Sequence, residues 1–394
     1  MSTVSTNALL NDDQKMLVEG AERYAKSVYS AAARSASMAE PEGFSRQRWA
    51  EFADMGWLGL GLPEDLGGVY GAQEVAILLD AIGGALVVEP FLDNVVLCGP
   101  LLAAHGSAEQ RALVSSMIAG KTQFAFAAAE ARSRYDLYDV ATSVERTPQG
   151  LVLTGEKHLV ACGDSADYLL VLARDKAMPA ANARDGLSLL LVPRQTPGVS
   201  TRGYRTYDGR RCADVVFDKV SLPASAMVGT AGAAWPVVEA ACDRMHVALA
   251  AEAAGVMQTV LDMTTEYART RKQFGRPIVA NQVYQHRLVD MYVHVEEARS
   301  LALHAAAMLD EDEAARARWA SGAKAYVSAA GRKVGEEGVQ LHGAIGMTEE
   351  YAAGGLYKRL AAIANQYGDA EWHYRRIRDL ADAQAVGEMD EANS

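Results

Sequence analysis

The apolar pattern of this chain changes its period twice, and this change constrains the fold more than any single residue. In residues 1–121 apolar side chains recur at helix spacing, as they do in 17–28. In residues 122–230 short apolar runs such as 168–172 are separated by turn residues, which predicts β-strands. Long stretches rich in alanine and leucine follow in 231–385 and again have helix spacing. We therefore expect an α+β fold that is mostly α, with an N-terminal helical domain, a small central β-barrel or sandwich, and a C-terminal four-helix bundle.

Composition narrows the class of protein. The formal charge of −12 argues against a general attraction to nucleic acid or to an anionic membrane. The first residues contain no apolar leader core and no later stretch is apolar enough to span a membrane, so we expect a cytoplasmic protein. The 4 cysteines form no Cys-x-x-Cys pair and the histidines lack metal-ligand spacing, so we predict no metal site. The acidic segment 386–394 has a composition typical of disorder.

Three stretches carry the most specific pattern: RKQFGRPI at 271–278, QLHGAIGMTEEY at 340–351 and ANQYGDAEWH at 364–373. They resemble the flavin-binding signatures of the acyl-CoA dehydrogenase family. Together with the turn LPEDLGG at 62–68, the resemblance covers nearly the whole chain in the family's order. It implies the three-domain fold of that family, FAD as the cofactor, an acyl-CoA substrate, and an electron-transfer flavoprotein or a similar protein as electron acceptor.

Shorter stretches resemble one branch of the family. The stretches ALVVEPF at 85–91, SRYDL at 133–137 and YGDA at 367–370 are most similar to the small subunit of pimeloyl-CoA dehydrogenase and to related heteromeric enzymes. This resemblance implies that the chain works beside a second, homologous chain. It suggests a dicarboxylic acyl-CoA or another bulky thioester as substrate, such as a steroid side chain, in lipid or steroid β-oxidation.

One catalytic residue of the family is missing. In the family a carboxylate removes a proton alpha to the thioester while hydride leaves the beta carbon for the flavin. Counting from Gln340, that glutamate falls on Tyr367, whose phenol, with a pKa of about 10, is mostly protonated at neutral pH. Some relatives place the carboxylate on the first long helix of the bundle, which corresponds to Met245. Asp243 and Glu252 lie nearby and are candidates, although a helix-surface or interhelical ion pair is the preferred explanation for both. We therefore assign no catalytic residue to this chain.

The resemblance also locates the part of the site that binds the flavin ring, here called the ring-side half. Many homologues bind the ring with threonine hydroxyls and cover it with a tryptophan, in stretches that match 126–136 and 157–161 of this chain. Ala129 and Ala161 replace the threonines, and Leu159 replaces the tryptophan. Each lost hydroxyl removes a hydrogen bond worth about 0.5–1.5 kcal/mol. We predict that the ring-side half has decayed.

The part of the site that binds the rest of FAD, here called the dinucleotide half, is better preserved. Arg271 provides a cationic fork suited to pyrophosphate, Phe274 an apolar face, and Gln340 with Gly343 permits close approach of the backbone to the adenosine portion. The predicted cofactor-binding residues are Arg271, Gln273, Phe274, Gln340 and Gly343. Without the resemblance, a solvated helix end would explain Arg271 as well.

The two halves suggest that a complete FAD site is divided between two chains, because one FAD spans two subunits in the family. Our hypothesis is that this chain donates its dinucleotide half to an FAD whose ring and base belong to a homologous partner, in an α2β2 assembly. Three alternatives stay open: a self-sufficient homo-oligomeric dehydrogenase that uses Asp243, Glu252 or another carboxylate, a non-catalytic scaffold or acyl-CoA-binding subunit, and a flavin monooxygenase of the same fold. Glu349 is a further candidate, for the entrance of the acyl site.

Overall fold

The computed structural model describes residues 10–69, 71–178, 180–348 and 351–392. Their contacts divide the chain into two compact units. The bundle unit contains the residues up to Arg34, Ala72–Val87 and the residues from His246 onward, and the sheet unit contains Ser35–Gly71 and Val88–Met245. The N-terminal helices are thus shared between the two units. The three zones 1–121, 122–230 and 231–385 remain a prediction about domains and do not coincide with these units.

The sheet unit is built on one eight-stranded mixed sheet. Its strands are β1 (Phe124–Ala127), β2 (Ser143–Thr147), β3 (Gly150–Ala161), β4 (Tyr168–Asp175), β5 (Leu187–Pro193), β6 (Val199–Arg205), β7 (Arg211–Leu222) and β8 (Met227–Val228). The order is β6-β7-β3-β2-β4-β5-β8, with β1 paired to β4. The pairs β2–β3, β4–β5 and β6–β7 are antiparallel, as the turn residues between them predicted, whereas β1 and β2 run parallel to β4. Fully buried aliphatic side chains such as Val144, Leu153, Val171 and Val215 form its core.

Short helices accompany this sheet. They are α4 (Arg46–Asp54), η1 (Trp57–Gly59), η2 (Glu64–Leu66), the π-helix η3 (Leu92–Cys98), α6 (Gly99–His105), α7 (Ala108–Ile118) and η4 (Ala224–Ala226). All residues of η3 are buried. The Asn94 side chain fixes η3 to the open edge of β1, because its amide oxygen accepts from the Phe124 nitrogen at 2.7 Å and its amide nitrogen donates to the Phe124 oxygen at 3.2 Å.

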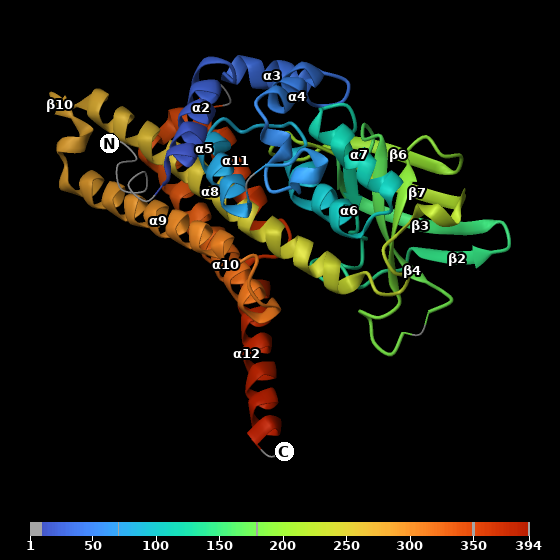
Figure 1. The fold of residues 1–394 in the computed structure, drawn as a ribbon. Coiled ribbons are helices and arrows are strands. Elements are labelled where there is room, and N and C mark those ends of the chain that lie inside the picture. The colour runs from blue at the N-terminus through green and yellow to red at the C-terminus, as the bar shows by residue number, and fades with distance from the viewer. Residues whose placement is uncertain (1–9, 70, 179, 349–350, 393–394) are drawn as a thin grey trace. The chain divides into compact units, whose positions relative to one another are not determined.

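The bundle unit consists of α2 (Asp12–Ser27), α5 (Ala72–Gly83), α9 (Gln282–Ala307), α10 (Glu313–His342), η6 (Gly343–Met347), α11 (Ala352–Asn365) and α12 (Ala370–Ala392). The helix α8 (Trp235–Thr270) contributes residues to both units, as does α3 (Ala31–Ala39). A short hairpin, β9 (Lys272–Gln273) and β10 (Arg276–Pro277), leads through η5 (Ile278–Ala280) to α9. The helix α10 packs against α9, α11 and α12 (Figure 1). A Cβ on Gly338 would lie 2.4 Å from Val260 Cγ1, so glycine is required where α10 approaches α8.

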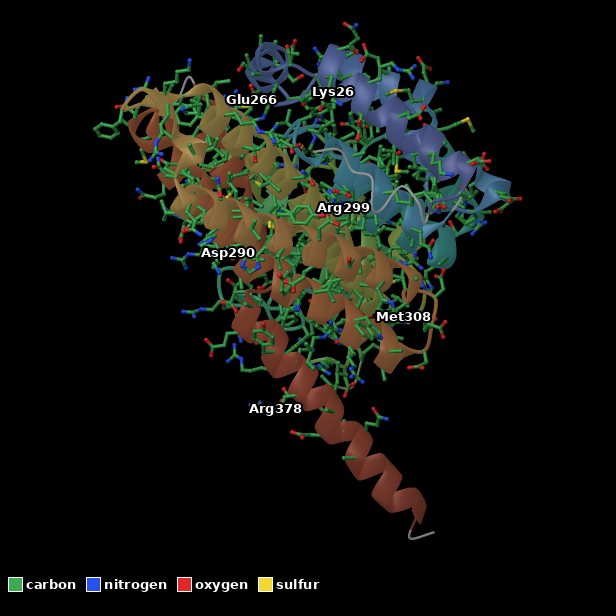
Figure 2. The ribbon with its side chains drawn as sticks, turned by 90° about the vertical axis from the view of Figure 1, so that its left-hand side faces the viewer. Lys26, Glu266, Asp290, Arg299, Met308 and Arg378 are labelled. Atoms are coloured by element: carbon green, nitrogen blue, oxygen red, sulfur yellow. The ribbon has the colours of Figure 1, made fainter. Side chains whose placement is uncertain are left out.

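A buried ion pair joins two helices of the bundle unit. The Arg299 side chain, labelled in Figure 2, belongs to α9, and its Nε donates to Asp80 Oδ2 of α5 at 2.7 Å. Arg299 is buried, and the carboxylates of Asp80 and Glu296 surround it. The predicted mostly helical α+β architecture is confirmed by these elements.

The end of the chain corrects one prediction. The segment 386–394 was expected to be disordered, but α12 continues as a helix to Ala392, and Figure 1 shows its last turns extending away from the other helices of the bundle unit. Extending an existing helix avoids the cost of nucleation, and alanine has the highest helix propensity, so the acidic composition did not decide the structure. Among the described residues, no helix combines the length and apolarity that crossing a membrane requires.

Candidate functional site

The loop 366–369 joins α11 to α12 and holds the position at which a catalytic carboxylate was sought. Tyr367 is half-buried and adopts a left-handed backbone conformation, with φ of 55°. Gly368 follows with φ of 115°, and a Cβ there would lie 2.7 Å from Nε2 of His373, so glycine is needed. A left-handed conformation at a residue other than glycine costs free energy and persists only where the surroundings enforce it.

Two buried basic side chains enforce the shape of this loop. The ring nitrogen Nε2 of His246 lies 3.0 Å from the Tyr367 carbonyl oxygen. Lys324 Nζ donates to the Gly368 carbonyl oxygen at 2.8 Å and to Ser328 Oγ at 2.9 Å. The Asp369 carboxylate caps α12 by accepting from the Trp372 nitrogen at 2.8 Å. These contacts reach the backbone of the loop and not the Tyr367 side chain, so they would hold a different residue at 367 in the same way.

The electrostatics of this region follow from burial. Desolvation lowers the pKa of Lys324 to about 7, although Asp369 opposes the change. Burial, together with the neighbouring His246 and Lys324, lowers the pKa of His373 well below its usual range, so this imidazole is neutral. The rings of His246 and His373 meet edge to face, with centroids 4.6 Å apart. Sequence reasoning missed Lys324 and His246, because the elements that carry them are far from the loop in sequence.

Glu252, one of the two carboxylates considered as a base, is committed to a buried ion pair. Its oxygens accept from Nε and NH2 of Arg359 at 2.7 and 2.6 Å, and the two residues are only 3% and 2% exposed. Arg359 NH1 also donates to Gln366 Oε1 at 3.2 Å, next to Tyr367. The interhelical ion pair between α8 and α11 therefore explains why a carboxylate is buried at position 252, and a role as base is not needed to explain it. Asp243 and Met245 are fully buried on α8, and Asp243 stays a candidate from sequence alone.

In the sheet unit, the two stretches that resemble ring-binding segments lie side by side. The His158 nitrogen donates to the Ala129 oxygen at 2.8 Å. Lys157 Nζ donates to the Ala128 oxygen at 2.9 Å and to Glu130 Oε1 at 2.8 Å. Burial lowers the pKa of Lys157 to about 8, whereas the pKa of Glu130 stays below its usual range because the Lys157 charge and two backbone amides outweigh its burial. The scaffold of the ring-side half is therefore intact.

The side chains on that scaffold do not suit a flavin ring. Ala129 and Ala161 are half-buried and offer no hydroxyl. Leu159 lies on a β-bulge with φ of 55° and is 63% exposed. Its backbone nitrogen donates to the Tyr204 hydroxyl at 3.2 Å, and that hydroxyl donates to Asp214 Oδ1 at 3.1 Å. The two threonine hydroxyls are thus absent, and the Leu159 amide is already engaged.

A buried carboxyl group beside these stretches was missed in the sequence. Asp93 of η3 is 8% exposed, and in the described part of the chain its one hydrogen bond comes from the Phe126 nitrogen at 3.4 Å. Burial raises the pKa of Asp93 to about 7, against the Phe126 amide and the charge of Arg210. The sequence signal was available, because Asp93, together with Asn94, interrupts the otherwise apolar run 91–98, where an acid is costly.

The five predicted cofactor-binding residues lie on two elements of the bundle unit. Arg271, Gln273 and Phe274 belong to the β9–β10 hairpin and are exposed, and the Phe274 side chain is 99% exposed with φ of 52°. Gln340 is exposed in the last turn of α10, and Gly343 begins η6 with φ of 66°. Exposed guanidinium and amide donors with an open backbone suit a diphosphate and a sugar.

His342 connects these two elements and was not predicted. It is buried, its Nδ1 lies 2.7 Å from the Gly338 oxygen, and its ring centroid lies 4.7 Å from that of Tyr267. Tyr267 accepts a backbone hydrogen bond from the Arg271 nitrogen at 2.8 Å. The junction of α10 and η6 is thus fixed against the end of α8 from which the hairpin starts. Glu349, proposed for the acyl entrance, lies outside the described residues.

Comparison with known proteins identifies the class of this fold and site. Three family models match consecutive parts of the chain: the acyl-CoA dehydrogenase N-terminal domain at 11–121, the middle domain at 125–220 and the C-terminal domain at 232–380. The chain belongs to the acyl-CoA dehydrogenase family. This confirms the predicted family and the predicted cofactor, FAD, and supports an oxidoreductase that acts on acyl-CoA.

Individual relatives are moderately similar. Acyl-CoA dehydrogenase fadE12 of Mycobacterium tuberculosis (strain CDC 1551 / Oshkosh) is 30% identical over 329 residues, which are 80% of this chain and 83% of the relative. The solved ChsE4-ChsE5 complex from Mycobacterium tuberculosis is similar with a TM-score of 0.83 and 27% identity, over 94% of this chain and 98% of the solved one. A structure described as the Tcur3481-Tcur3483 steroid ACAD, in a variant form, has a TM-score of 0.84 and 26% identity, over 95% and 99% of the two chains.

Proposed function

We propose that this chain is the base-lacking subunit of a heteromeric, FAD-dependent acyl-CoA dehydrogenase. The observation that carries the proposal is the loop 366–369, whose backbone is held in place while its functional position is occupied by Tyr367. Glu252 does not compensate, because Arg359 occupies both of its oxygens. A homologous partner would then supply the carboxylate that takes the alpha proton.

The surface of the bundle unit supports association with another chain. Large apolar side chains stand exposed on and near α9, the hairpin and η6: Phe274 at 99%, Met347 at 77%, Val283 at 59%, Val289 at 58% and Tyr292 at 48%. Apolar groups exposed in such number often mark a protein interface. Phe274 lies in the hairpin beside Arg271 and Gln273, and Met347 ends η6, which Gly343 begins, while α9 follows the hairpin in the chain. A partner that covered Phe274 and Met347 would therefore meet the dinucleotide half directly.

Three residues of the dinucleotide half have a defined role in this proposal. Arg271 binds pyrophosphate oxygens of an FAD whose ring lies in the partner, and Gln340 and the backbone at Gly343 contact its adenosine portion. Bound FAD supplies the acceptor for the hydride that leaves the substrate. His342 and Lys324 act indirectly, by fixing the backbone around these residues and around Tyr367. The substrate we propose is a bulky or dicarboxylic acyl-CoA, with an electron-transfer flavoprotein or similar protein as acceptor.

Co-purification tests the proposal. When this chain is expressed with a homologous acyl-CoA dehydrogenase chain from the same organism, we expect an α2β2 complex with fewer flavins than chains and with desaturation of a bulky acyl-CoA. The chain expressed alone should bind little flavin and leave acyl-CoA unchanged. Full flavin loading and desaturation by the chain alone would establish the homo-oligomeric alternative, and a colourless complex would establish the scaffold.

Substitution of Arg271 tests the dinucleotide half. Arg271→Ala in the complex removes a charge-assisted interaction worth about 1.5–3 kcal/mol, so we expect FAD to bind roughly 10- to 150-fold more weakly. The FAD affinity of Arg271→Lys should fall between those of Arg271→Ala and the wild type, because lysine keeps the charge but lacks the bidentate guanidinium. Arg276→Ala is the matched control, since Arg276 lies in the same hairpin and donates to Asn281 at 2.8 Å. Equal FAD affinity in Arg271→Ala and Arg276→Ala would contradict the assignment.

A further inference from the structure

The loop 366–369 rests on a fully buried lysine, Lys324 of α10. Its Nζ donates to the Gly368 carbonyl oxygen at 2.8 Å and to Ser328 Oγ at 2.9 Å. The Ser328 hydroxyl donates its own hydrogen to the Lys324 carbonyl oxygen at 2.7 Å, so its oxygen can only accept from Nζ. Within the described residues, Nζ therefore has two acceptors, and both are neutral.

Two neutral acceptors match an amine and not an ammonium ion. An ammonium group has three N–H donors and a full charge, and a buried donor without an acceptor costs more than a satisfied one contributes. A neutral amine has two N–H donors, which the Gly368 carbonyl and the Ser328 hydroxyl accept. The hydrogen bonds around Lys324 thus favour its uncharged form.

A second fully buried lysine shows what the charged form requires. Lys157 of β3 donates to Glu130 Oε1 at 2.8 Å as well as to the Ala128 carbonyl oxygen at 2.9 Å. A carboxylate at hydrogen-bonding distance compensates an ammonium charge directly. In the described part of the chain, Lys324 has no carboxylate at that distance, because the carboxylate of Asp369 caps α12 instead.

The charged and titratable groups around Lys324 come from the loop and from three helices. Burial is the main reason that its pKa falls to about 7, while the charge of Asp369 raises this pKa and that of Arg359 on α11 lowers it. His373 of α12 is neutral, because burial, His246 of α8 and Lys324 hold its pKa well below the usual range. Among the described residues, no charged group of α9 or η6 acts on Lys324. A proton taken up by Nζ is therefore only partly compensated.

The Gly368 carbonyl is one of two backbone groups through which the loop is held, and the other is the Tyr367 carbonyl beside His246 Nε2. Opening of the loop would let water solvate Nζ, which relieves the cost of a buried charge. The left-handed conformation of Tyr367 is kept only while these contacts enforce it. We propose that Lys324 is a positioning residue that holds the loop as a neutral amine, and that the loop loosens when this amine takes up a proton.

Proton linkage fixes the direction of the effect. The pKa of Lys324 is about 7 in the closed loop, against 10.5 for a lysine in water. Below pH 7 Nζ is protonated in both forms, so the opening equilibrium does not change with pH. Between pH 7 and pH 10.5 opening takes up a proton, so each added pH unit disfavours opening by up to about tenfold. The loop is held most tightly in alkaline solution.

Hydrogen exchange of the full chain, measured by mass spectrometry between pH 6 and pH 9 and corrected for intrinsic exchange rates, tests this role. The amides of Gln366, Trp372 and His373 report on the loop, because they donate to the Ala362 oxygen and to the carboxylate and carbonyl oxygens of Asp369. We expect their protection to rise roughly 10- to 100-fold from pH 6 to pH 9.

Variants of Lys324 separate a neutral donor from a charged one. Lys324→Gln offers two N–H donors and does not titrate, so the loop should be about as protected as in the wild type at pH 9, and equally so at pH 6. Lys324→Arg stays charged and should leave the loop weakly protected at every pH. Lys333→Gln is the matched control, since Lys333 is exposed on the same helix, and it should keep the wild-type pH dependence.

Protection in the wild type that stays constant or falls from pH 6 to pH 9 would overturn the role of Lys324. The same pH dependence in Lys324→Gln as in the wild type would overturn it too. Neither result bears on the proposed function, which depends on the residue at position 367 and not on the protonation of Lys324. Circular dichroism confirms that each variant is folded, and the wild-type profile alone decides the matter if a Lys324 variant is not.

Discussion

Replacing Arg359 by methionine is expected to lower the free energy of unfolding by about 3–5 kcal/mol. Glu252 would lose two hydrogen bonds of 2.7 and 2.6 Å while its carboxylate stayed buried on α8. Burying a charge without its partner costs far more than the pair contributes when it is intact. The variant should therefore unfold at a clearly lower urea concentration, measured by circular dichroism of the helices.

Two further variants define the origin of this effect. The double variant Glu252→Leu/Arg359→Met removes both charges and should regain most of the lost stability, because apolar residues of similar size replace a buried pair at little cost. Arg332→Met is the matched control, since Arg332 pairs with Glu336 on the surface of α10 and should change stability by less than about 1 kcal/mol. If the double variant is as unstable as Arg359→Met, the pair is not the source of the loss.

Asp93→Asn is expected to stabilise the protein, and to do so only above about pH 3.8, where Asp93 is ionised in the unfolded state. The pKa of Asp93 is raised from 3.8 to about 7 in the folded chain. Below pH 3.8 the carboxyl is protonated in both states and costs nothing. Between pH 3.8 and about 7 it ionises in the unfolded state alone, so the wild type loses stability as the pH rises, and above about 7 the loss is constant. About three pH units at 1.36 kcal/mol each set an upper limit of about 4 kcal/mol.

Urea unfolding at pH 5 and pH 8 measures this dependence. The advantage of Asp93→Asn over the wild type should grow by about 2–3 kcal/mol from the lower to the higher pH. The thiols on which the Asp93 charge acts do not obscure it, because burial raises the pKa of Cys98, Cys162 and Cys212 and these thiols stay protonated. Asp218→Asn, at an exposed position of β7, is the control and should show no such growth. A constant difference between the two pH values would mean that Asp93 is not a charge buried in the folded state.

The sequence predicted the fold well because the fold depends on the period of the apolar pattern and on the order of the segments along the chain. Helix spacing, strand spacing and the motifs at 271–278 and 340–351 are local signals, and they were sufficient for the family and for the α+β architecture. The division into units was not predictable in the same way. It depends on which unit the N-terminal helices pack against: α2 packs against α5, and α5 packs against α9, while α4 and α7 belong to the sheet unit.

The candidate site was predicted only where a motif contained it. Tyr367 was found by counting, but the groups that hold its loop, Lys324 and His246, come from other helices and carry no local signature. Glu252 remained ambiguous because its partner, Arg359, is 107 residues away in the chain. Asp93 needed no distant contact, because the apolar residues that flank the pair Asp93-Asn94 were sufficient to indicate a buried acid.

The hydrogen bonds from His246 and Lys324 to the backbone of the loop 366–369 also bear on how a base-lacking subunit of the proposed kind would arise. Because they do not involve the side chain at 367, a duplicated gene could exchange a glutamate for a tyrosine there without unfolding its product. At position 367 the catalytic side chain and the fold of the loop are therefore independent. One gene copy can lose the catalytic residue while selection still preserves the fold that assembly requires.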